Sequence, residues 1–517
     1  MKTYGMRLLL SVVLALSFGQ TALCDIGETL YSNDQVKVVL GMMLRNVSRD
    51  CSKFDHSGRR YAPGAVIASP SFPGSPADFT QYYERVWVRD SALTMSCLAD
   101  AVKKSLPGIE TYDVASILND YLVFSTMMQQ NFGFDGCKNV SDNYGQALAA
   151  VNGSPEKWSK QSDGPALRAI ATMKIMEAIG EQNVKVPARS VYDKKIDCND
   201  MGMLKRDLEY VSVAFNYSGK DYKDMWEEQE GVFFFNQMVQ YEALNKGEAF
   251  ATSHGDGEAG KYYASKKLEI ARSLESNYWR GKYLSVWMAE GCPGTIREQC
   301  PARGDENCKN IGVILGFIHA DFPGLPLSDP KVLQTADAIR RAFCNRYGID
   351  KRCLLLGRYP VDCFNGNSKD GQGDRQANPW VLSTHAMAQF YYKLANTVYV
   401  DKKIELPKEA LSFFELVLSK ETYGKLAALA NEKGRLVAGD ALFVPVLKEI
   451  ANQGDDMIKA VRDLYPVPKA VEASADWLPE QINAADGSKM SARDLSWSYA
   501  SLLTALMERM DLEKRLR

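Results

Sequence analysis

Histidine is scarce in this chain, and the cysteines form no compact motif. Only 4 of the 517 residues are histidine, and the 11 cysteines include no Cys-x-x-Cys pair. Structural zinc sites usually combine four cysteine or histidine ligands at short spacings. The sequence therefore gives no support for a zinc centre, and we expect a protein that works without a metal or a cofactor.

The chain also lacks basic clusters and, after its first residues, long apolar runs. Its formal net charge is -2, with 62 Lys and Arg against 64 Asp and Glu. Nucleic-acid-binding proteins usually carry a basic patch, so no nucleic-acid partner is expected. A membrane helix needs about 18 or more apolar residues. No run of that length follows residue 24, so we expect no membrane anchor.

Linker segments and strand-like alternation are equally scarce. No Ser/Gly/Pro-rich stretch divides the chain, although its length alone allows about three domains. Apolar windows of helical length alternate instead with polar loops. These windows cover residues 91–104, 115–130, 165–179, 232–245, 261–276, 332–344, 381–395, 411–418, 435–451 and 491–510. We therefore predict one all-α domain with long functional loops at one end.

Residues 1–24 have the layout of a secretory signal peptide. Lys2 and Arg7 precede an apolar core at residues 8–16, and Ala22 and Cys24 form a small-x-small cut site. The segment is too short to span a membrane. We expect a mature domain of residues 25–517 that is secreted or delivered to the lumen of the secretory or a lysosome-like pathway.

Export agrees with the remaining cysteines and with four sequons. Without Cys24 ten cysteines are left, which pair into up to five disulfides in an oxidising compartment. Six of the ten lie close together as a stapled loop, at residues 292, 300, 308, 344, 353 and 363. Asn-x-Ser/Thr sequons, which accept N-linked glycans, occur at Asn46, Asn139, Asn152 and Asn216.

An acidic stretch, DMWEEQEG at residues 224–231, precedes the apolar run VFFF. Phe234, Met238 and Tyr241 recur at helical spacing after it and predict a helix with a buried face. Glu227 and Glu228 would then lie at a loop-to-helix junction, where functional groups are common. An acidic first turn that complements the helix dipole explains the same residues equally well.

The loop before the helix window at residue 91 is crowded with aromatic and charged residues. Tyr83, Trp87, Arg89 and Asp90 occur within eight positions. The simplest interpretation makes Asp90 the N-cap of that helix and Trp87 part of the core.

Three later loops repeat this mixture of aromatic and charged residues. Trp158 lies in a polar loop just before a helix start at Asp163, and Arg358 lies beside a tyrosine. Glu480 precedes the last helix, for which Ser491 and Asp494 predict a capping box. A lone glutamate at such a place is normally solvated surface.

Taken together, these residues suit the cleavage of a glycosidic bond. Sugars present apolar C–H faces and many hydroxyls, so their sites combine aromatic rings with Asp, Glu and Arg. Cleavage needs one protonated and one ionised carboxyl group. Repulsion between Glu227 and Glu228 beside an indole is expected to raise the pKa of one of them. Glu480 is the candidate for the ionised partner.

Six motifs that occur in family order resemble the glucoamylases of glycoside hydrolase family 15. They are GAVIASPS at 64–71, WVRDS at 87–91, DGPALR at 163–168, DMWEE at 224–228, GRYP at 357–360 with NPW at 378–380, and SARDLSWSY at 491–499. The resemblance covers nearly the whole mature chain. It implies a six-fold α/α barrel of twelve helices in two concentric rings, with the active site in a funnel at one end.

The resemblance also implies an exo-acting glucan 1,4-α-glucosidase that releases β-glucose with inversion. Glu227 is the implied general acid and Glu480 the implied general base, roughly 6.5 to 9.5 Å apart with a water between them. Ser491 is the implied hydrogen-bond partner of the base.

The same resemblance assigns the substrate-binding residues. Arg89 and Asp90 are expected to hold the terminal glucose. Glu228 and Arg358 are expected to bind the next sugar. The implied aromatic walls of the first subsites are Tyr83, Trp87, Trp158 and Trp226.

The chain ends soon after the last helix window, so no separate starch-binding module is expected. We expect a monomer that acts on soluble starch, glycogen or malto-oligosaccharides. Two other functions remain open. One is an α/α-barrel glycosidase for trehalose, isomaltose or dextran, because one fold hosts several specificities. The other is a non-catalytic glucan-binding protein on the same scaffold.

Overall fold

The structure is a computed structural model that describes residues 29–75, 79–132, 144–186, 191–194, 202–216, 222–288, 308–366, 378–471 and 476–517. The predicted signal peptide at residues 1–24 and the sequon at Asn139 lie outside these ranges. Among the helices of these ranges, none combines the length and the apolar character that a membrane span requires.

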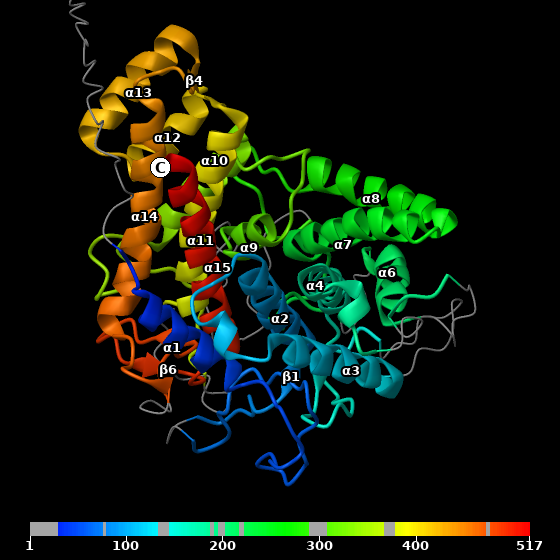
Figure 1. Ribbon diagram of the computed structural model, residues 1–517. Helices are drawn as coiled ribbons and strands as arrows, with labels where there is room; N and C mark the ends of the chain where they lie inside the picture. The colour runs from blue at the N-terminus through cyan, green and yellow to red at the C-terminus, as the bar shows by residue number, and fades with distance from the viewer. Residues whose placement is uncertain are drawn as a thin grey trace, which may run out of the picture.

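Six helices form a closed inner ring (Figure 1). Each packs against the next in chain order, and the last packs against the first. Most residues of these helices are buried, because neighbours cover them from several directions. The inner helices are α2 (Val88–Lys103), α4 (Asp163–Ile179), α7 (Phe234–Ser253), α9 (Gly312–His319), α11 (Val381–Asp401) and α15 (Ser496–Leu516).

Six further helices lie outside this ring. In α14 the apolar residues Val446, Leu447 and Ile450 recur at helical spacing and face α11, which is typical of a helix covered on one side. The two rings confirm the predicted six-fold α/α barrel. The outer helices are α1 (Asn33–Leu44), α3 (Val114–Phe132), α6 (Met203–Ala214), α8 (Gly257–Asn277), α10 (Pro330–Phe343) and α14 (Phe443–Leu464).

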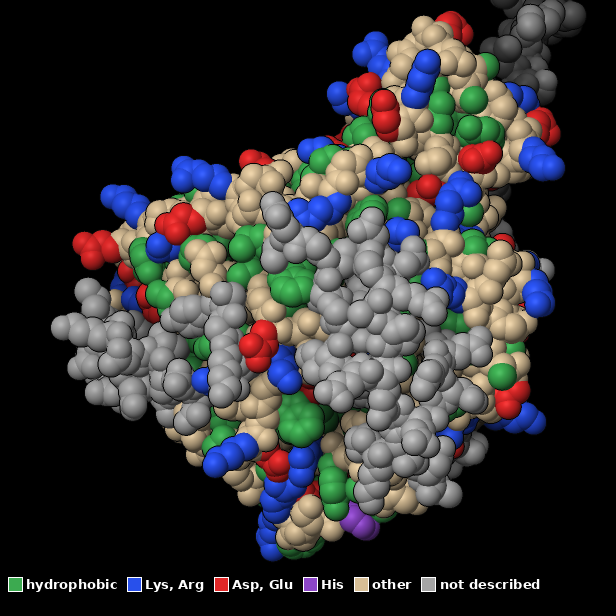
Figure 2. Space-filling view, turned by 180° about the vertical axis from the view of Figure 1, so that it is seen from behind, with side chains coloured by type: hydrophobic (Ala, Val, Ile, Leu, Met, Phe, Trp, Pro, Cys, Tyr) green, Lys and Arg blue, Asp and Glu red, His purple; other side chains and the backbone are tan. Residues whose placement is uncertain are grey.

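A small projection extends from the barrel at the top of Figure 1. It contains α12 (Leu411–Val417), α13 (Lys420–Lys433) and a hairpin of β3 (Lys403–Glu405) and β4 (Arg435–Val437). On the coloured parts of the face in Figure 2, acidic and basic side chains are interspersed, on the projection as well as on the barrel. This distribution agrees with the near-neutral net charge.

Four more short strands and three 3-10 turns complete the described elements. β1 (Val86–Trp87) pairs with β2 (Leu148–Ala149), and β5 (Gln481–Ile482) pairs with β6 (Lys489–Met490), both antiparallel. The 3-10 turns are η1 (Ile109–Thr111), η2 (Glu181–Asn183) and η4 (Lys408–Ala410). β1 contains the predicted site residue Trp87, and β5 begins directly after Glu480.

Each predicted helix window overlaps a helix, but the window at 435–451 begins on strand β4, eight positions before α14 starts at Phe443. Two predictions of N-terminal caps are also wrong. Asp90 is not an N-cap, because α2 already begins at Val88 after Trp87. The capping box of Ser491 and Asp494 is also wrong. Helix α15 begins at Ser496, and both residues have left-handed backbone angles, with φ of 61° and 49°. Their side chains make long-range contacts instead.

Cysteines and sequons only partly follow the predictions. Cys344 and Cys353 form a disulfide, and Cys308 and Cys363 are also disulfide-bonded. Cys51 and Cys97 are free thiols, so the remaining eight cysteines can form four disulfides at most. Four of these eight, at residues 137, 198, 292 and 300, lie outside the described ranges.

Asn46 is not a usable glycosylation site in the folded protein. Its side chain is buried, and its amide nitrogen donates to Asp494 and Ser496. Asn152 and Asn216 are exposed.

Candidate active site

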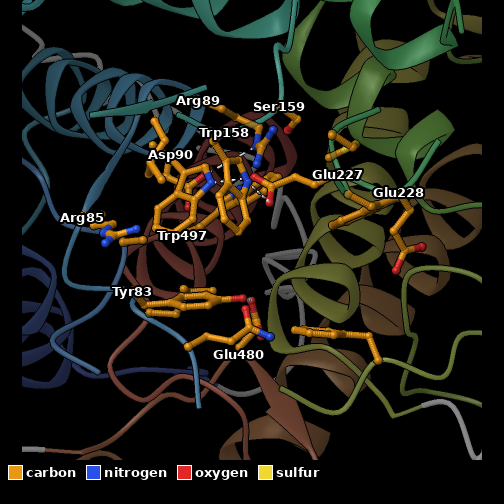
Figure 3. A pocket seen from close by; sticks show the side chains of 18 of the residues that line it. Tyr83, Arg85, Arg89, Asp90, Trp158, Ser159, Glu227, Glu228, Glu480 and Trp497 are labelled. Carbon is orange, nitrogen blue, oxygen red and sulfur yellow. Dashed lines mark hydrogen bonds and ion pairs between the residues drawn. The ribbon is translucent and has the colours of Figure 1, made fainter. Parts of the chain in front are cut away.

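All ten predicted site residues line one pocket of about 610 Å³. Most of them lie in the loops that precede inner helices or in the first helical turn (Figure 3). The predicted site residues are therefore positioned mainly by the loops and first turns of the inner helices. The ten residues are Tyr83, Trp87, Arg89, Asp90, Trp158, Trp226, Glu227, Glu228, Arg358 and Glu480.

Glu227 is held between two indoles. Trp87 donates its Nε1–H to one carboxyl oxygen at 2.6 Å, and Trp158 donates to the other at 2.5 Å. Trp87 is buried, whereas Trp158 is 47% exposed. One oxygen of Glu227 therefore has a fixed partner inside the protein, and the other has a partner at the pocket mouth.

Asp224 builds the turn that presents Glu227. Its Oδ1 accepts the backbone N–H groups of Glu228 and Gln229, at 2.8 and 3.1 Å. Glu227 itself adopts a left-handed φ of 65°, which is uncommon for a residue other than glycine. Burial, followed by the nearby carboxylate of Glu228, raises the pKa of Asp224 to about 7.

Glu228 points away from Glu227, towards a different set of partners. Arg358 donates to Glu228 Oε1 at 2.7 Å, and the hydroxyl of Tyr359 donates to Oε2. Arg358 also forms a two-pronged ion pair with Asp362, at 2.7 and 2.6 Å. The two adjacent glutamates were expected to act on each other, but each is bound by partners of its own.

Glu480 lies across the pocket from Glu227 in Figure 3. Tyr83 donates its hydroxyl to Glu480 Oε1 at 3.1 Å, and Ser491 donates to Oε2. The Ser491 bond is the one that the sequence predicted. Burial raises the pKa of Glu480 to about 7, although the bonds from Ser491 and Tyr83 lower it. Burial also raises the pKa of Tyr83 well above 10, so Tyr83 remains a donor.

Arg89 and Asp90 form a buried ion pair at 3.3 Å in the first turn of α2. Gln161 and Asp163 also bind the Arg89 guanidinium, at 2.6 and 3.2 Å. Burial raises the pKa of Asp90 to about 6, although Arg89 lowers it. This ion pair joins Arg89 Nε to Asp90 Oδ1, and both atoms are buried. The two side chains form part of the pocket wall.

Aromatic rings build the base of the pocket, and the sequence prediction named only some of them. Trp226 lies 5.6 Å from Trp380 and 6.4 Å from Trp497 between ring centroids, and its indole nitrogen donates to Asn310. Trp380 and Trp497 line the pocket but were not predicted as site residues. The signal was present, because each belongs to a motif that carried the family resemblance.

The pocket combines two groups suited to proton transfer with groups suited to binding sugars. Glu227 and Glu480 come from loops more than 250 positions apart and border the same cavity. Indoles, a buried Arg–Asp pair and a second Arg–Glu pair surround them. Within the described ranges, no group of three or more acidic, histidine or cysteine side chains is arranged as a metal site.

Relatives of the chain share this architecture. The solved structure of a glucoamylase from Saccharomycopsis fibuligera has a TM-score of 0.72 at 24% identity, and the match covers 94% of this chain and 96% of that one. The structure of a glycoside hydrolase family 15 glucoamylase from Hypocrea jecorina has a TM-score of 0.69 at 23% identity, with coverage of 93% and 73%. At this identity the two likenesses show the fold.

Sequence comparison extends over a similar length. A glucoamylase of Blastobotrys adeninivorans is 28% identical over 475 residues, which are 88% of this chain and 68% of the relative. A second glucoamylase, from Saccharomycopsis fibuligera, is 26% identical over 495 residues, covering 92% of this chain and 89% of the relative. The model of glycosyl hydrolases family 15 matches residues 38–507. The chain therefore belongs to glycosyl hydrolases family 15.

Proposed function

We propose that this protein is an exo-acting glucan 1,4-α-glucosidase that releases β-D-glucose with inversion from the non-reducing ends of starch, glycogen or malto-oligosaccharides. The observation that carries the proposal is the pair Glu227 and Glu480, which border one pocket from two different loops. The names of the relatives, all glucoamylases, support the same substrate class.

Glu227 is the proposed general acid. It stands at the mouth side of the pocket, where Trp158 is half exposed and a chain of sugars would leave the cavity. Its partner Trp87 is buried and fixes the orientation of the carboxyl group. The oxygen that Trp158 contacts can then face the glycosidic oxygen and donate the proton to the leaving sugar.

Glu480 is the proposed general base. Ser491 and Tyr83 donate hydrogen bonds to its two oxygens, which favours the ionised form against the effect of burial. Each carboxylate oxygen accepts more than one hydrogen bond, so Glu480 can also hold the attacking water. Attack by that water from the face opposite the leaving group inverts the anomeric centre.

The closed end of the pocket is proposed to bind the terminal glucose. Arg89 and Asp90 line this part of the pocket, and their charged side chains would bind sugar hydroxyls. Trp87, Trp226 and Tyr83 line the same space and offer faces for the sugar C–H groups. We propose that the pocket ends at these residues, which would favour release of one sugar at a time.

The next sugar is proposed to contact Glu228, Arg358 and Trp158. The Glu228–Arg358 ion pair is fixed by Asp362 and Tyr359, so its polar atoms are pre-organised before substrate arrives. Trp158 adds an exposed aromatic face. We also propose that the enzyme is exported and monomeric and that it acts on soluble glucans.

Product analysis on maltotriose and on trehalose tests the substrate class. We expect glucose and maltose as the first products of maltotriose, and little hydrolysis of trehalose. Glu227→Gln and Glu480→Gln are each expected to lower kcat by about a thousandfold or more while calorimetry still detects maltotriose binding. Efficient cleavage of trehalose, or near-normal turnover in either variant, would refute the proposal.

A further inference from the structure

The loop that carries Glu480 is folded against the chain segment that carries Ser491. β5 and β6 pair antiparallel, and the backbone continues this pairing beyond them. Glu480 N donates to Ala492 O at 2.8 Å, and Leu495 N donates to Leu478 O at 3.1 Å. Ser491 is therefore brought beside Glu480 by backbone pairing, and its hydroxyl can donate to the carboxylate.

The segment that follows β6 is in an unusual conformation. Ser491 and Asp494 both have left-handed φ angles, of 61° and 49°. Residues other than glycine adopt this region at a cost, so surrounding contacts must hold them there. Gly366 packs so closely on Ser491 that a Cβ at Gly366 would lie 2.5 Å from the Ser491 hydroxyl oxygen.

Asp494 ties three parts of the fold together. Its Oδ1 accepts the backbone N–H of Trp477 at 2.9 Å and the hydroxyl of Tyr499. Its Oδ2 accepts a hydrogen bond from Nη2 of Arg45 at 2.7 Å. Trp477 begins the Glu480 loop, Tyr499 belongs to α15, and Arg45 follows α1. The side chain of Asp494 is only 1% exposed, so these contacts replace hydrogen bonds to solvent.

The backbone around Asp494 is fixed by the N-terminal segment as well. Asn46 donates to the Asp494 carbonyl at 2.7 Å. Ser71 Oγ accepts the backbone N–H of Arg493, at 2.9 Å. Both ends of the Glu480 loop are therefore attached to residues that do not themselves line the pocket, Asn46 and Ser71 among them.

We propose that Asp494 is a positioning residue for the general base. Its carboxylate holds the start of the Glu480 loop and the left-handed turn after β6 in one arrangement, which keeps the Ser491 hydroxyl on Glu480. Asp494 itself does not line the active-site pocket. The inference rests on the proposed role of Glu480 as the base.

Loss of this arrangement would change the pKa of Glu480, which a general loss of stability would not do. The Ser491 bond lowers the pKa of Glu480, against burial, which raises it. If the turn relaxes and the bond is lost, the pKa of Glu480 rises further. The base must be ionised to activate water, so the acid limb of the pH profile moves to higher pH.

The test compares Asp494→Asn with Asp455→Asn, a matched control. Asp455 is also a buried carboxylate that binds an arginine and a tyrosine hydroxyl, Arg509 and Tyr392, but it lies on α14 and does not line the pocket. We expect Asp494→Asn to lower kcat on maltotriose by about tenfold or more and to change KM by less than about threefold. We also expect its acid limb to rise by about half a pH unit or more.

Asp455→Asn is expected to lower the melting temperature without moving the acid limb. Arg45→Gln is the milder variant, because Arg45 is partly exposed, and it is expected to shift the limb in the same direction. If Asp494→Asn does not fold, Arg45→Gln decides the question. A limb unchanged in the folded Asp494 and Arg45 variants, or moved equally by Asp455→Asn, overturns the inference.

The turnover of Glu480→Gln distinguishes a wrong assignment of the base from a wrong positioning role for Asp494. If Glu480→Gln keeps its turnover, the base assignment fails and the Asp494 inference fails with it. If Glu480→Gln is inactive but Asp494→Asn and Arg45→Gln behave like the wild type, only the positioning role is wrong.

Discussion

Trp158 donates its indole N–H to Glu227 at 2.5 Å, although nearly half of this side chain is exposed at the pocket mouth. An exposed indole in a polar loop needs a partner to be held in place, and the carboxylate supplies it. The same carboxylate is bound on its other oxygen by the buried Trp87. The orientation of Glu227 therefore depends on two donors of very different mobility.

Trp158→Phe removes the donor and keeps an aromatic face for sugar stacking. The proposed acid is protonated when it acts, and a hydrogen bond between neutral groups contributes about 0.5 to 1.5 kcal/mol, so we expect kcat on maltotriose to fall about two- to tenfold, with a smaller change in KM. Steady-state kinetics measures both constants. Trp279→Phe, outside the pocket, is the control and should keep wild-type kcat. An unchanged kcat in Trp158→Phe would show that this bond does not orient the acid.

The pH dependence of kcat/KM should report the buried base. Because Glu480 must be ionised to activate water, activity falls as the pH drops through its pKa. Burial raises that pKa from 4.5 to about 7. We therefore expect the acid limb on maltotriose above pH 4.5, with Ser491→Ala moving it higher still. An acid limb below pH 4.5 in the wild type would contradict this reading of Glu480.

Glu480 should also make the folded protein less stable at high pH. Its pKa in the folded state, about 7, lies above the ordinary value of 4.5. The free energy of unfolding therefore falls as the pH rises from 4.5 to about 7, and this group does not lower it below pH 4.5. A difference of this size corresponds to about 3 kcal/mol as an upper bound. We expect Glu480→Gln to raise the melting temperature at pH 8 and to raise it much less at pH 4. An equal change at both pH values would contradict the expectation.

The sequon at Asn46 should carry no glycan. Its amide nitrogen binds Asp494 and Ser496 inside the fold, whereas Asn152 and Asn216 are exposed. In protein from a glycosylating host, peptide mapping should find glycans at one or both exposed sites and unmodified Asn46. Asn46→Ala should lower the free energy of unfolding by about 1 to 3 kcal/mol, because it leaves buried groups unpaired. A glycan on Asn46 of the folded protein would contradict the structure.

Most of the barrel helices could be predicted from the sequence, because inner and outer helices bury long apolar stretches. Among the described residues, four helices fall outside the windows named from the sequence, namely α1, α6, α9 and α13. Helix α9 has only eight residues and is apolar on all sides, so it has no helical periodicity to detect. Helix α13 buries only two of its residues, Thr422 and Leu426, so its apolar pattern is weak.

The errors near the site have a common cause. Ser491 and Asp494 have the right spacing for a capping box, yet Ser491 donates to Glu480, 11 positions earlier, and Asp494 pairs with Arg45 near the start of the chain. Local propensity cannot anticipate such contacts, because the partner Arg45 is more than 400 positions away. The ten residues named from the family resemblance line one pocket. The motifs do not indicate that Glu227 and Glu228 bind different partners.

The anomeric form of the first glucose released is the most direct test of the proposed mechanism. Proton NMR during the first minutes of maltotriose hydrolysis distinguishes the two anomers before mutarotation mixes them. If Glu227 protonates the leaving oxygen while Glu480 directs a water to the opposite face, the initial product is β-glucose. Initial release of α-glucose would contradict the two-carboxyl inverting mechanism proposed for this pocket.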